Sequence, residues 1–232
     1  MKYLALASDF DGTLAQDGRV DAETLRAVER LRHSGRKMIL VTGRQLHELL
    51  DVFPESDRCD WVVAENGALL YQPTTQQIRL LAEPPPEAFL HRLRERGVGP
   101  ISAGRVIVAT WEPHQAEVLG AIHDLGLELQ VIFNKGAVMV LPTGVNKATG
   151  LAAALELMGL SPASVVGVGD AENDHAFLNF CGFSVAVGNA LPAIVEEVDL
   201  VTQAGHGAGV CQLIEELLAD DLASRAHRVR LS

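Results

Sequence analysis

The chain has 232 residues, of which 48% are hydrophobic, and it carries a formal net charge of −11. This length accommodates one large domain or two modest ones with a buried core. The acidic charge argues against nucleic acid as a main partner, and no apolar run reaches the roughly 18 to 20 residues of a membrane span. The three cysteines lack metal-site spacing, and no leader-like segment is recognisable. Both features favour a cytoplasmic protein with free thiols.

Strands and helices alternate through the first third of the chain. The apolar run 3–7 predicts a buried strand, and a helix is expected between Asp21 as its N-cap and Gly35 as its stop. The next expected elements are a strand at 37–42, a helix at 45–52, a strand at 61–64 and a hairpin formed by 68–71 and 77–81.

The alternation of strands and helices stops at Pro84-Pro85-Pro86, a run that is typical of a stiff hinge. The following residues predict an α+β module rather than βαβ units, so we expect an inserted small cap over residues 84–142. Its expected elements are a helix at 87–96, a strand at 105–111, a helix at 114–125 and strands at 129–133 and 137–141 around Asn134-Lys135-Gly136.

The first rhythm resumes after the cap. Its expected elements are helices at 147–158, 171–180, 192–198 and 209–218 and strands at 165–168, 183–187 and 200–201. This alternation predicts an α/β fold, a Rossmann-like doubly wound parallel sheet whose core comprises residues 1–83 and 143–232. The basic tail 224–230 is expected to be a solvated end rather than a binding patch.

Chemically active side chains recur where strands end or helices begin. Asp9 and Asp11 follow the first strand, and Thr42-Gly43-Arg44 follows the second. Lys147 opens the helix after the cap, and Gly169-Asp170-Ala171-Glu172-Asn173-Asp174 follows a later strand. Each piece alone has an ordinary structural explanation as a turn, a helix cap or a solvated surface. Because carboxyl ends of parallel strands form ligand sites, their joint occurrence favours one site.

Together these residues supply what phosphoryl transfer needs. A carboxylate can attack phosphorus, and a second acid can move the protons of the leaving alcohol and of water. Clustered carboxylates suit Mg²⁺, which prefers oxygen ligands. A hydroxyl, backbone amides and a fixed ammonium can stabilise charge on the transferred oxygens.

These motifs resemble those of the haloacid dehalogenase superfamily of phosphatases. Asp9-Phe10-Asp11-Gly12-Thr13-Leu14 is similar to its first motif, Thr42-Gly43-Arg44 to its second, Lys147 to its third, and the run 169–174 to its fourth. The cap position and Asn66-Gly67-Ala68 resemble the Cof-type subfamily with a class IIB cap. The compact cap is similar to those of phosphoglycolate and sugar-phosphate phosphatases.

The resemblance implies a nucleophile, an acid/base and a metal site. It assigns the nucleophile and a Mg²⁺ ligand to Asp9. It assigns the acid/base to Asp11, whose backbone carbonyl also binds the metal. It further implies that Asp170 binds Mg²⁺ directly and that Asp174 binds it directly or through water.

The resemblance also implies a phosphate-binding set. Thr42 and the Gly43 amide bind the phosphoryl oxygens, Arg44 belongs to the same set, and Lys147 neutralises them. For Asn173 two roles stay open, contact with the substrate phosphate or support of Lys147.

The sequence thus predicts a Mg²⁺-dependent phosphatase that hydrolyses a small phosphorylated metabolite through an aspartyl phosphate, as a monomer or homodimer. Three alternatives are open: a phosphomutase, a receiver-like phosphoaspartate signalling module, and a non-catalytic binding domain. The second aspartate, Asp11, and the inserted cap argue against the signalling module.

Some further residues have two interpretations. Asn189 follows a strand at the same sheet edge. It either supports the site residues or has no role in the site. The glycine-rich run around His206 favours a loop or a helix start over a phosphate cradle. Cap residues either contact the leaving group of the substrate or are structural; these are Arg105, Trp111, His114 and Lys135.

Overall fold

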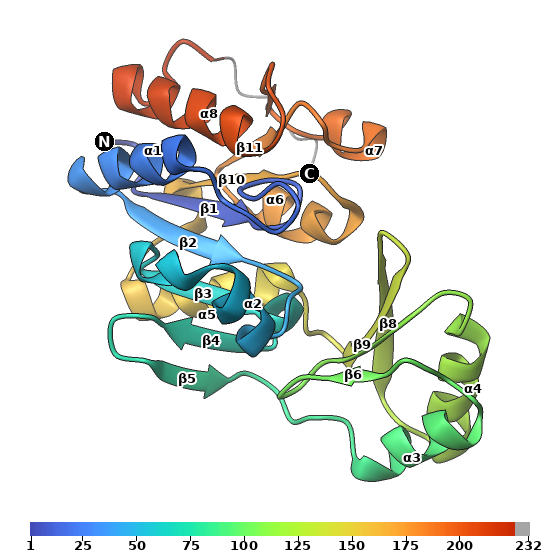
Figure 1. Ribbon diagram of the computed structural model, residues 1–232. Helices are drawn as coiled ribbons and strands as arrows, with labels where there is room; N and C mark the ends of the chain where they lie inside the picture. Colours follow the sequence, from blue (N-terminus) through green and yellow to red (C-terminus); the bar gives the residue numbers. More distant parts are fainter. Residues whose placement is uncertain (226–232) are drawn as a thin grey trace.

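Two β-sheets organise the chain in the computed structural model, which describes residues 1–225 (Figure 1). The larger sheet has the order β12-β11-β10-β1-β2-β3-β4-β5, and the pairs from β12 to β3 are parallel while β4 and β5 are antiparallel. This confirms the predicted α/β class. The strands are β1 (Ala5–Asp9), β2 (Lys37–Val41), β3 (Trp61–Ala64), β4 (Leu69–Gln72), β5 (Gln77–Leu80), β10 (Val165–Gly169), β11 (Phe183–Ala186) and β12 (Leu200–Val201).

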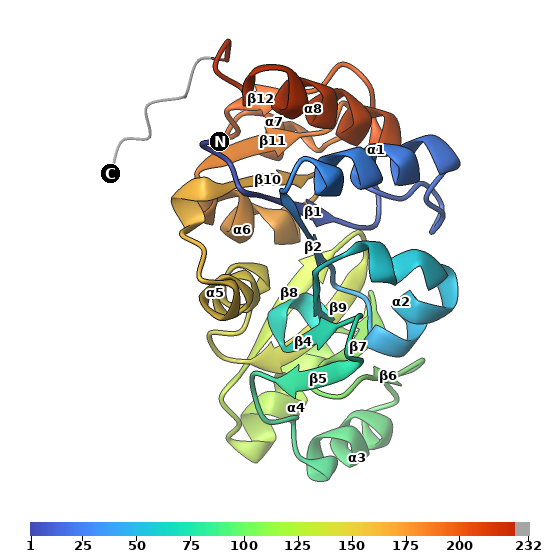
Figure 2. The ribbon, with the colours of Figure 1, turned by 90° about the vertical axis from the view of Figure 1, so that its left-hand side faces the viewer.

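Helices cover both faces of this sheet, as a doubly wound core requires (Figure 2). One face packs against α1 (Ala22–His33), α2 (Leu46–Val52) and α8 (His206–Asp220). The opposite face packs against α5 (Lys147–Met158), α6 (His175–Phe180) and α7 (Pro192–Val195). Short 3-10 turns complete the core at η1 (Pro54–Arg58), η2 (Glu65–Gly67), η3 (Pro162–Ser164) and η4 (Glu172–Asp174).

The residues between β5 and α5 form a second sheet, antiparallel throughout, which we call the cap segment. One of its faces is covered by two helices through an apolar cluster that includes Phe89, Leu93 and Val118. Its other face is turned toward the core, where Val106, Ile107 and Met139 pack with Ala68. The elements are α3 (Glu87–Glu95), β6 (Ser102–Ala103), β7 (Val108–Trp111), α4 (Gln115–Leu125), β8 (Leu129–Asn134) and β9 (Ala137–Pro142).

Several elements differ from those expected. Strand β6 is not among the expected elements, and α7 ends at Val195 rather than at residue 198. The strand expected from Arg105 begins only at Val108, because the amides of residues 105–107 bind the Glu65 carboxylate instead of a neighbouring strand. The helix expected over 171–180 is divided into η4 and α6, since Asp174 turns back to accept backbone hydrogen bonds. The closing helix begins at His206, so the glycine-rich run is a helix start.

Strand order decides which residues meet. β1 lies between β2 and β10, although β10 follows it by more than a hundred residues. The carboxyl ends of these three strands therefore bring Asp9, Thr42 and Asp170 to one edge of the sheet. None of the helices within residues 1–225 is long and apolar enough to cross a membrane. The basic tail is described only to Arg225, so its remainder lies outside the described residues.

Candidate active site

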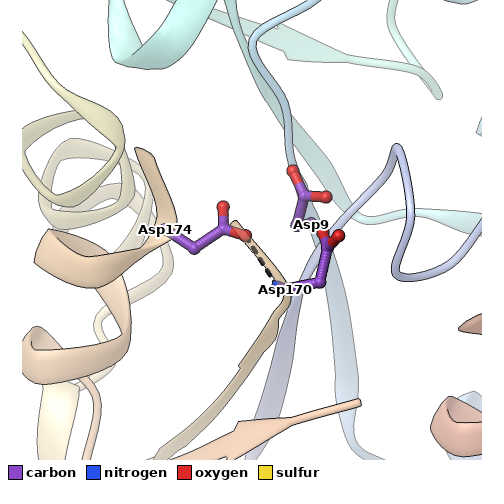
Figure 3. A group of neighbouring side chains, drawn as sticks. All are labelled: Asp9, Asp170 and Asp174. Carbon is purple, nitrogen blue, oxygen red and sulfur yellow. Dashed lines mark hydrogen bonds between the residues drawn. The ribbon is translucent and has the colours of Figure 1, made fainter. Parts of the chain in front are cut away.

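Three buried carboxylates converge at this edge of the sheet (Figure 3). Asp9 ends β1, Asp170 follows β10, and Asp174 closes the turn η4. One oxygen of each lies within 4.8 Å of the others, and the residues are 4%, 3% and 0% exposed. Asp174 Oδ2 accepts hydrogen bonds from the amides of Asp170 (2.9 Å) and Ala171 (3.0 Å), which fixes the turn that carries both acids.

Lys147 lies among these acids with its ammonium fully buried. Its Nζ donates to Asp9 Oδ1 at 2.6 Å and to Asp174 Oδ1 at 2.5 Å. A lysine in the first turn of a helix is electrostatically disfavoured, so these carboxylates are what keep it there. Burial lowers the pKa of Lys147, but the charges of Asp174 and Asp9 outweigh this effect and raise it overall. The side chain therefore stays an ammonium.

The acidic cluster contains more carboxylates than ammonium groups. Burial, followed by repulsion from Asp174, raises the pKa of Asp9 from 3.8 to about 8, although Lys147 opposes the shift. Lys147 pairs with Asp9 and Asp174, and the partly exposed Lys135 pairs with Asp170. Three carboxylates thus face two ammonium groups, so a further cation is electrostatically favoured here.

The donor set at this point fits a hard divalent cation. The Lys135 ammonium, which reaches in from the turn between β8 and β9, donates to Asp170 Oδ2 (2.8 Å) and to the Asp11 carbonyl (3.2 Å). A positive group thus already bridges a carboxylate and a backbone carbonyl, both oxygen ligands of the kind Mg²⁺ takes. Thr13 Oγ1 donates to the other oxygen of Asp170 at 3.0 Å and orients it.

Asp11 faces a different partner. Arg44 binds its carboxylate with two hydrogen bonds, from Nε at 2.6 Å and from Nη2 at 2.7 Å. This contact raises the pKa of Arg44, and the guanidinium also lies over the Phe10 ring, 5.6 Å from its centre. The pair is partly exposed, since the Asp11 side chain is 39% accessible. Asp11 is thus available to a ligand, but its carboxylate is held in place.

The loop after β2 supplies polar groups next to the acids. Thr42 is 1% exposed and its hydroxyl accepts the Arg44 amide at 3.1 Å. Asn173 donates to Asn66 Oδ1 at 3.2 Å. Both open roles for Asn173, contact with the substrate phosphate and support of Lys147, stay predictions.

A cavity of about 420 Å³ opens onto these groups. The core contributes one wall, which includes Asp9, Asp11, Gly43 and Arg44. The cap segment contributes the facing wall, which is largely apolar; its members include Ile101, Ile107, Ala109, Trp111, Lys135, Ala137 and Met139. The cavity therefore lies between the two sheets, with most charged groups on the core side and Lys135 on the cap side.

The four cap candidates separate into two groups. Trp111 and Lys135 line the cavity. By contrast, the Arg105 amide binds Glu65, and His114 Nε2 lies 3.0 Å from the Gly99 carbonyl. Within the described residues, the structure thus gives the last two a structural contact.

Asn189 and His206 hold the loop that carries Asp11. Asn189 Nδ2 donates to the Gly12 carbonyl at 2.9 Å, and His206 Nδ1 lies 3.0 Å from the same oxygen. Asn189 thus buttresses the site, one of its two expected interpretations.

Sequence reasoning missed Thr13 and Glu65. Thr13 lies inside the first motif, and Glu65 directly follows β3 as other active residues follow their strands. Position at a strand end was the available signal for Glu65.

The chain matches the haloacid dehalogenase-like hydrolase family over residues 6–94 and 114–214. It belongs to this family. It is 32% identical over 223 residues to a phosphoglycolate phosphatase of Methanothermobacter thermautotrophicus, covering 92% of this chain and 98% of the relative. The predicted family and the phosphatase class are thereby confirmed.

Solved structures show the same fold at low sequence identity. A protein of Thermoplasma acidophilum aligns with a TM-score of 0.81 at 15% identity, covering 94% of this chain and 99% of that one. A sugar phosphatase of subclass IIB aligns with a TM-score of 0.74 at 18% identity, covering 92% and 98%. The fold of this chain is therefore shared with these solved structures.

The raised pKa of Asp9 predicts a pH dependence of stability without metal. A carboxyl whose pKa is higher in the folded than in the unfolded state loses stabilising free energy as pH rises between the two values. With EDTA present, the free energy of unfolding of wild type should fall relative to Asp9→Asn between about pH 4 and pH 8. Urea titrations across this range measure the difference. A constant difference would show that Asp9 ionises normally.

Divalent cations should stabilise the protein through the acidic cluster. At Mg²⁺ about a hundred times its Kd, Tm should rise by about 5–10 °C. Asp170→Asn should lose most of this rise, whereas Asp60→Asn, which changes a carboxylate at the other end of the strands, should keep it. Differential scanning fluorimetry with EDTA and Mg²⁺ measures the shifts. An equal rise in both variants would place the cation elsewhere.

Proposed function

We propose that the chain hydrolyses a small phosphomonoester, of the phosphoglycolate or sugar-phosphate type, with Mg²⁺ and through an aspartyl-phosphate intermediate. One observation carries the proposal. Asp9 ends β1 at the floor of a cavity, with one oxygen fixed by the buried Lys147 ammonium and two more carboxylates beside it. This arrangement combines an oriented nucleophile with a site for a cation.

In the first step, a carboxylate oxygen of Asp9 attacks phosphorus and the bond from phosphorus to the ester oxygen breaks. Asp11 gives its proton to the departing alkoxide, so the alcohol leaves neutral. Lys147, the Thr42 hydroxyl and the Gly43 amide stabilise the charge on the three remaining phosphoryl oxygens.

In the second step, water attacks the phosphorus of the aspartyl phosphate. Asp11, now a carboxylate, accepts a proton from this water, and the bond from phosphorus to Asp9 breaks. Inorganic phosphate is released and the Asp9 carboxylate is restored. Asp11 ends the cycle protonated, which is the form that the next first step requires.

Arg44 links phosphate binding to the state of Asp11. Its two hydrogen bonds hold the Asp11 carboxylate, whereas the first step needs Asp11 free to give a proton to the leaving group. A substrate phosphate competes with Asp11 for the guanidinium, because both are bidentate acceptors. Binding of the substrate would thus release Asp11 for proton transfer, which agrees with the assignment of Arg44 to the phosphate-binding set.

The cluster would hold Mg²⁺ through Asp9, Asp170 and the Asp11 carbonyl, with Asp174 directly or through water. The cation would neutralise charge on the phosphoryl oxygens. The Lys135 ammonium would compete with Mg²⁺ for this position, because it donates to the Asp11 carbonyl and to Asp170, two of the same ligands.

The division into a core (1–83 and 143–232) and a cap (84–142) that chooses the substrate is part of this proposal. It is supported by the two separate sheets and by the cap residues that line the cavity. Closure of the cap would exclude water from the reacting groups. The cytoplasmic location and the monomeric or dimeric state stay predictions.

Phosphomutase and receiver-like signalling are the alternatives. A mutase would return the phosphoryl group to a second hydroxyl, and a receiver would keep it on Asp9. The acid/base Asp11 and the walled cavity favour hydrolysis of a bound ester over storage of the phosphoryl group.

The nucleophile is tested by phosphate release from a panel of small phosphomonoesters. With Mg²⁺, wild type should release phosphate, and Asp9→Asn should reduce kcat by about a thousandfold or more. Asp51→Asn, which alters an exposed carboxylate outside the cavity, should keep normal activity. Transfer without release would favour the mutase, and stable phosphorylation of Asp9 without turnover would favour the signalling module.

The acid/base role of Asp11 predicts a dependence on the leaving group. Asp11→Asn should lower kcat for alkyl phosphates by about 100-fold to 10,000-fold. The loss should be much smaller for p-nitrophenyl phosphate, whose leaving group departs without protonation. The ratio of the two losses is measured by steady-state kinetics. Equal losses would assign Asp11 to phosphate binding instead.

A further inference from the structure

Glu65 joins the core to the cap segment through a fully buried carboxylate. It follows β3 and is 0% exposed. Its Oε1 accepts the amide of Arg105 at 2.9 Å, and its Oε2 accepts those of Val106 (2.8 Å) and Ile107 (3.0 Å). Hydrogen bonds to an ionised acceptor are about twice as strong as neutral ones. One core side chain thus holds three successive amides of the cap segment.

The backbone at Glu65 is hydrogen-bonded to the loop that carries Thr42 and Arg44. Its backbone amide donates to the Arg44 carbonyl at 2.9 Å, and the amide of Asn66 donates to the Thr42 carbonyl at 2.9 Å. Asn66 in turn accepts the Asn173 side chain. Glu65 is therefore a direct connection between the phosphate-binding residues and the cap segment.

The backbone at this connection is strained. Glu65 and Asn66 have φ of 51° and 56°, in the left-handed region that non-glycine residues rarely adopt, and Gly67 follows at 101°. Such conformations are energetically costly and persist where surrounding contacts over-determine them. Here the bonds to Thr42, Arg44 and the cap amides are those contacts.

The cap side of the contact is closely fitted. A Cβ on Gly104 would lie 2.7 Å from Glu65 Oε1, so any side chain there would displace the carboxylate. The bound loop leads into β7, and Ile107 and Ala109 line the cavity opposite Asp9. The position of this wall therefore depends on the Glu65 contact.

We propose that Glu65 is a positioning residue: its carboxylate fixes the loop 104–107, and with it the leaving-group wall of the cavity, against the loop that carries Thr42 and Arg44. Its effect on catalysis rests on the proposed function. Its effect on the loop does not, so the two are tested separately.

Hydrogen–deuterium exchange tests the contact directly. In Glu65→Gln the carboxamide keeps the size but loses the charge, and its NH₂ group cannot accept an amide. Peptides covering 105–107 should exchange about tenfold faster or more than in wild type. Gly104→Ala should do the same from the cap side. Asp60→Asn, which removes a carboxylate that accepts a core amide, should leave this loop unchanged.

Kinetics test the positioning role. In Glu65→Gln, KM for the best phosphomonoester should rise about tenfold or more. The Ki of inorganic phosphate, which lacks a leaving group, should change by less than about twofold. A rise in KM without a rise in Ki would indicate that the cavity wall is displaced while the phosphate-binding residues are intact.

Three results decide the proposal. Unchanged exchange at 105–107 in both variants would overturn the contact. Parallel increases in KM and Ki would overturn the positioning role, because Glu65 would then support the core site alone. If wild type hydrolyses no phosphomonoester, the proposed function fails, and exchange alone supports or overturns the contact.

Discussion

The active site depends on one buried ion cluster, the Lys147 ammonium between Asp9 and Asp174. A buried charge is tolerated only when partners surround it, and removing one partner of such a pair typically costs about 3–5 kcal/mol. Here the ammonium both orients the proposed nucleophile and compensates part of its charge. Three carboxylates stand against Lys147 and the partly exposed Lys135, and this excess of acidic groups is what makes the cluster a candidate cation site. The buried charge of the Asp9 carboxylate thus lowers the stability of the folded protein, although the proposed chemistry requires that charge.

The cluster exists because the parallel sheet brings distant segments to one edge. β1, β2 and β10 are adjacent, so their carboxyl ends deliver Asp9, Thr42 and Asp170 together. Short contacts then fix each loop: Asp174 binds the amides that follow β10, and Asn189 holds Gly12. The catalytic groups are therefore held by the sheet and by carboxylate or amide side chains, and little is left to flexible loops.

The cap segment meets this edge with a mostly apolar wall and one cation, Lys135. In the proposed function, the phosphoryl chemistry and the recognition of the leaving group thus belong to different sheets. Because the wall of the cavity must be positioned against the core when substrate binds, we expect the contact between Glu65 and the loop at 104–107 to affect substrate binding. In this proposal, the Glu65 carboxylate of the core positions the cavity wall that the cap segment contributes.

The sequence by itself determined the alternating fold and the residues of the acidic cluster, because hydrophobic periodicity and local motif spacing record these features. Asp21 as a helix cap and Lys147 as the first residue of a helix also followed from local pattern. Only the tertiary structure decided that Arg44 binds Asp11, that Lys135 reaches Asp170 from the cap, and that Glu65 replaces a strand partner for residues 105–107. These pairs join segments far apart in the chain, and long polar side chains choose partners by distance in space, which no local pattern encodes.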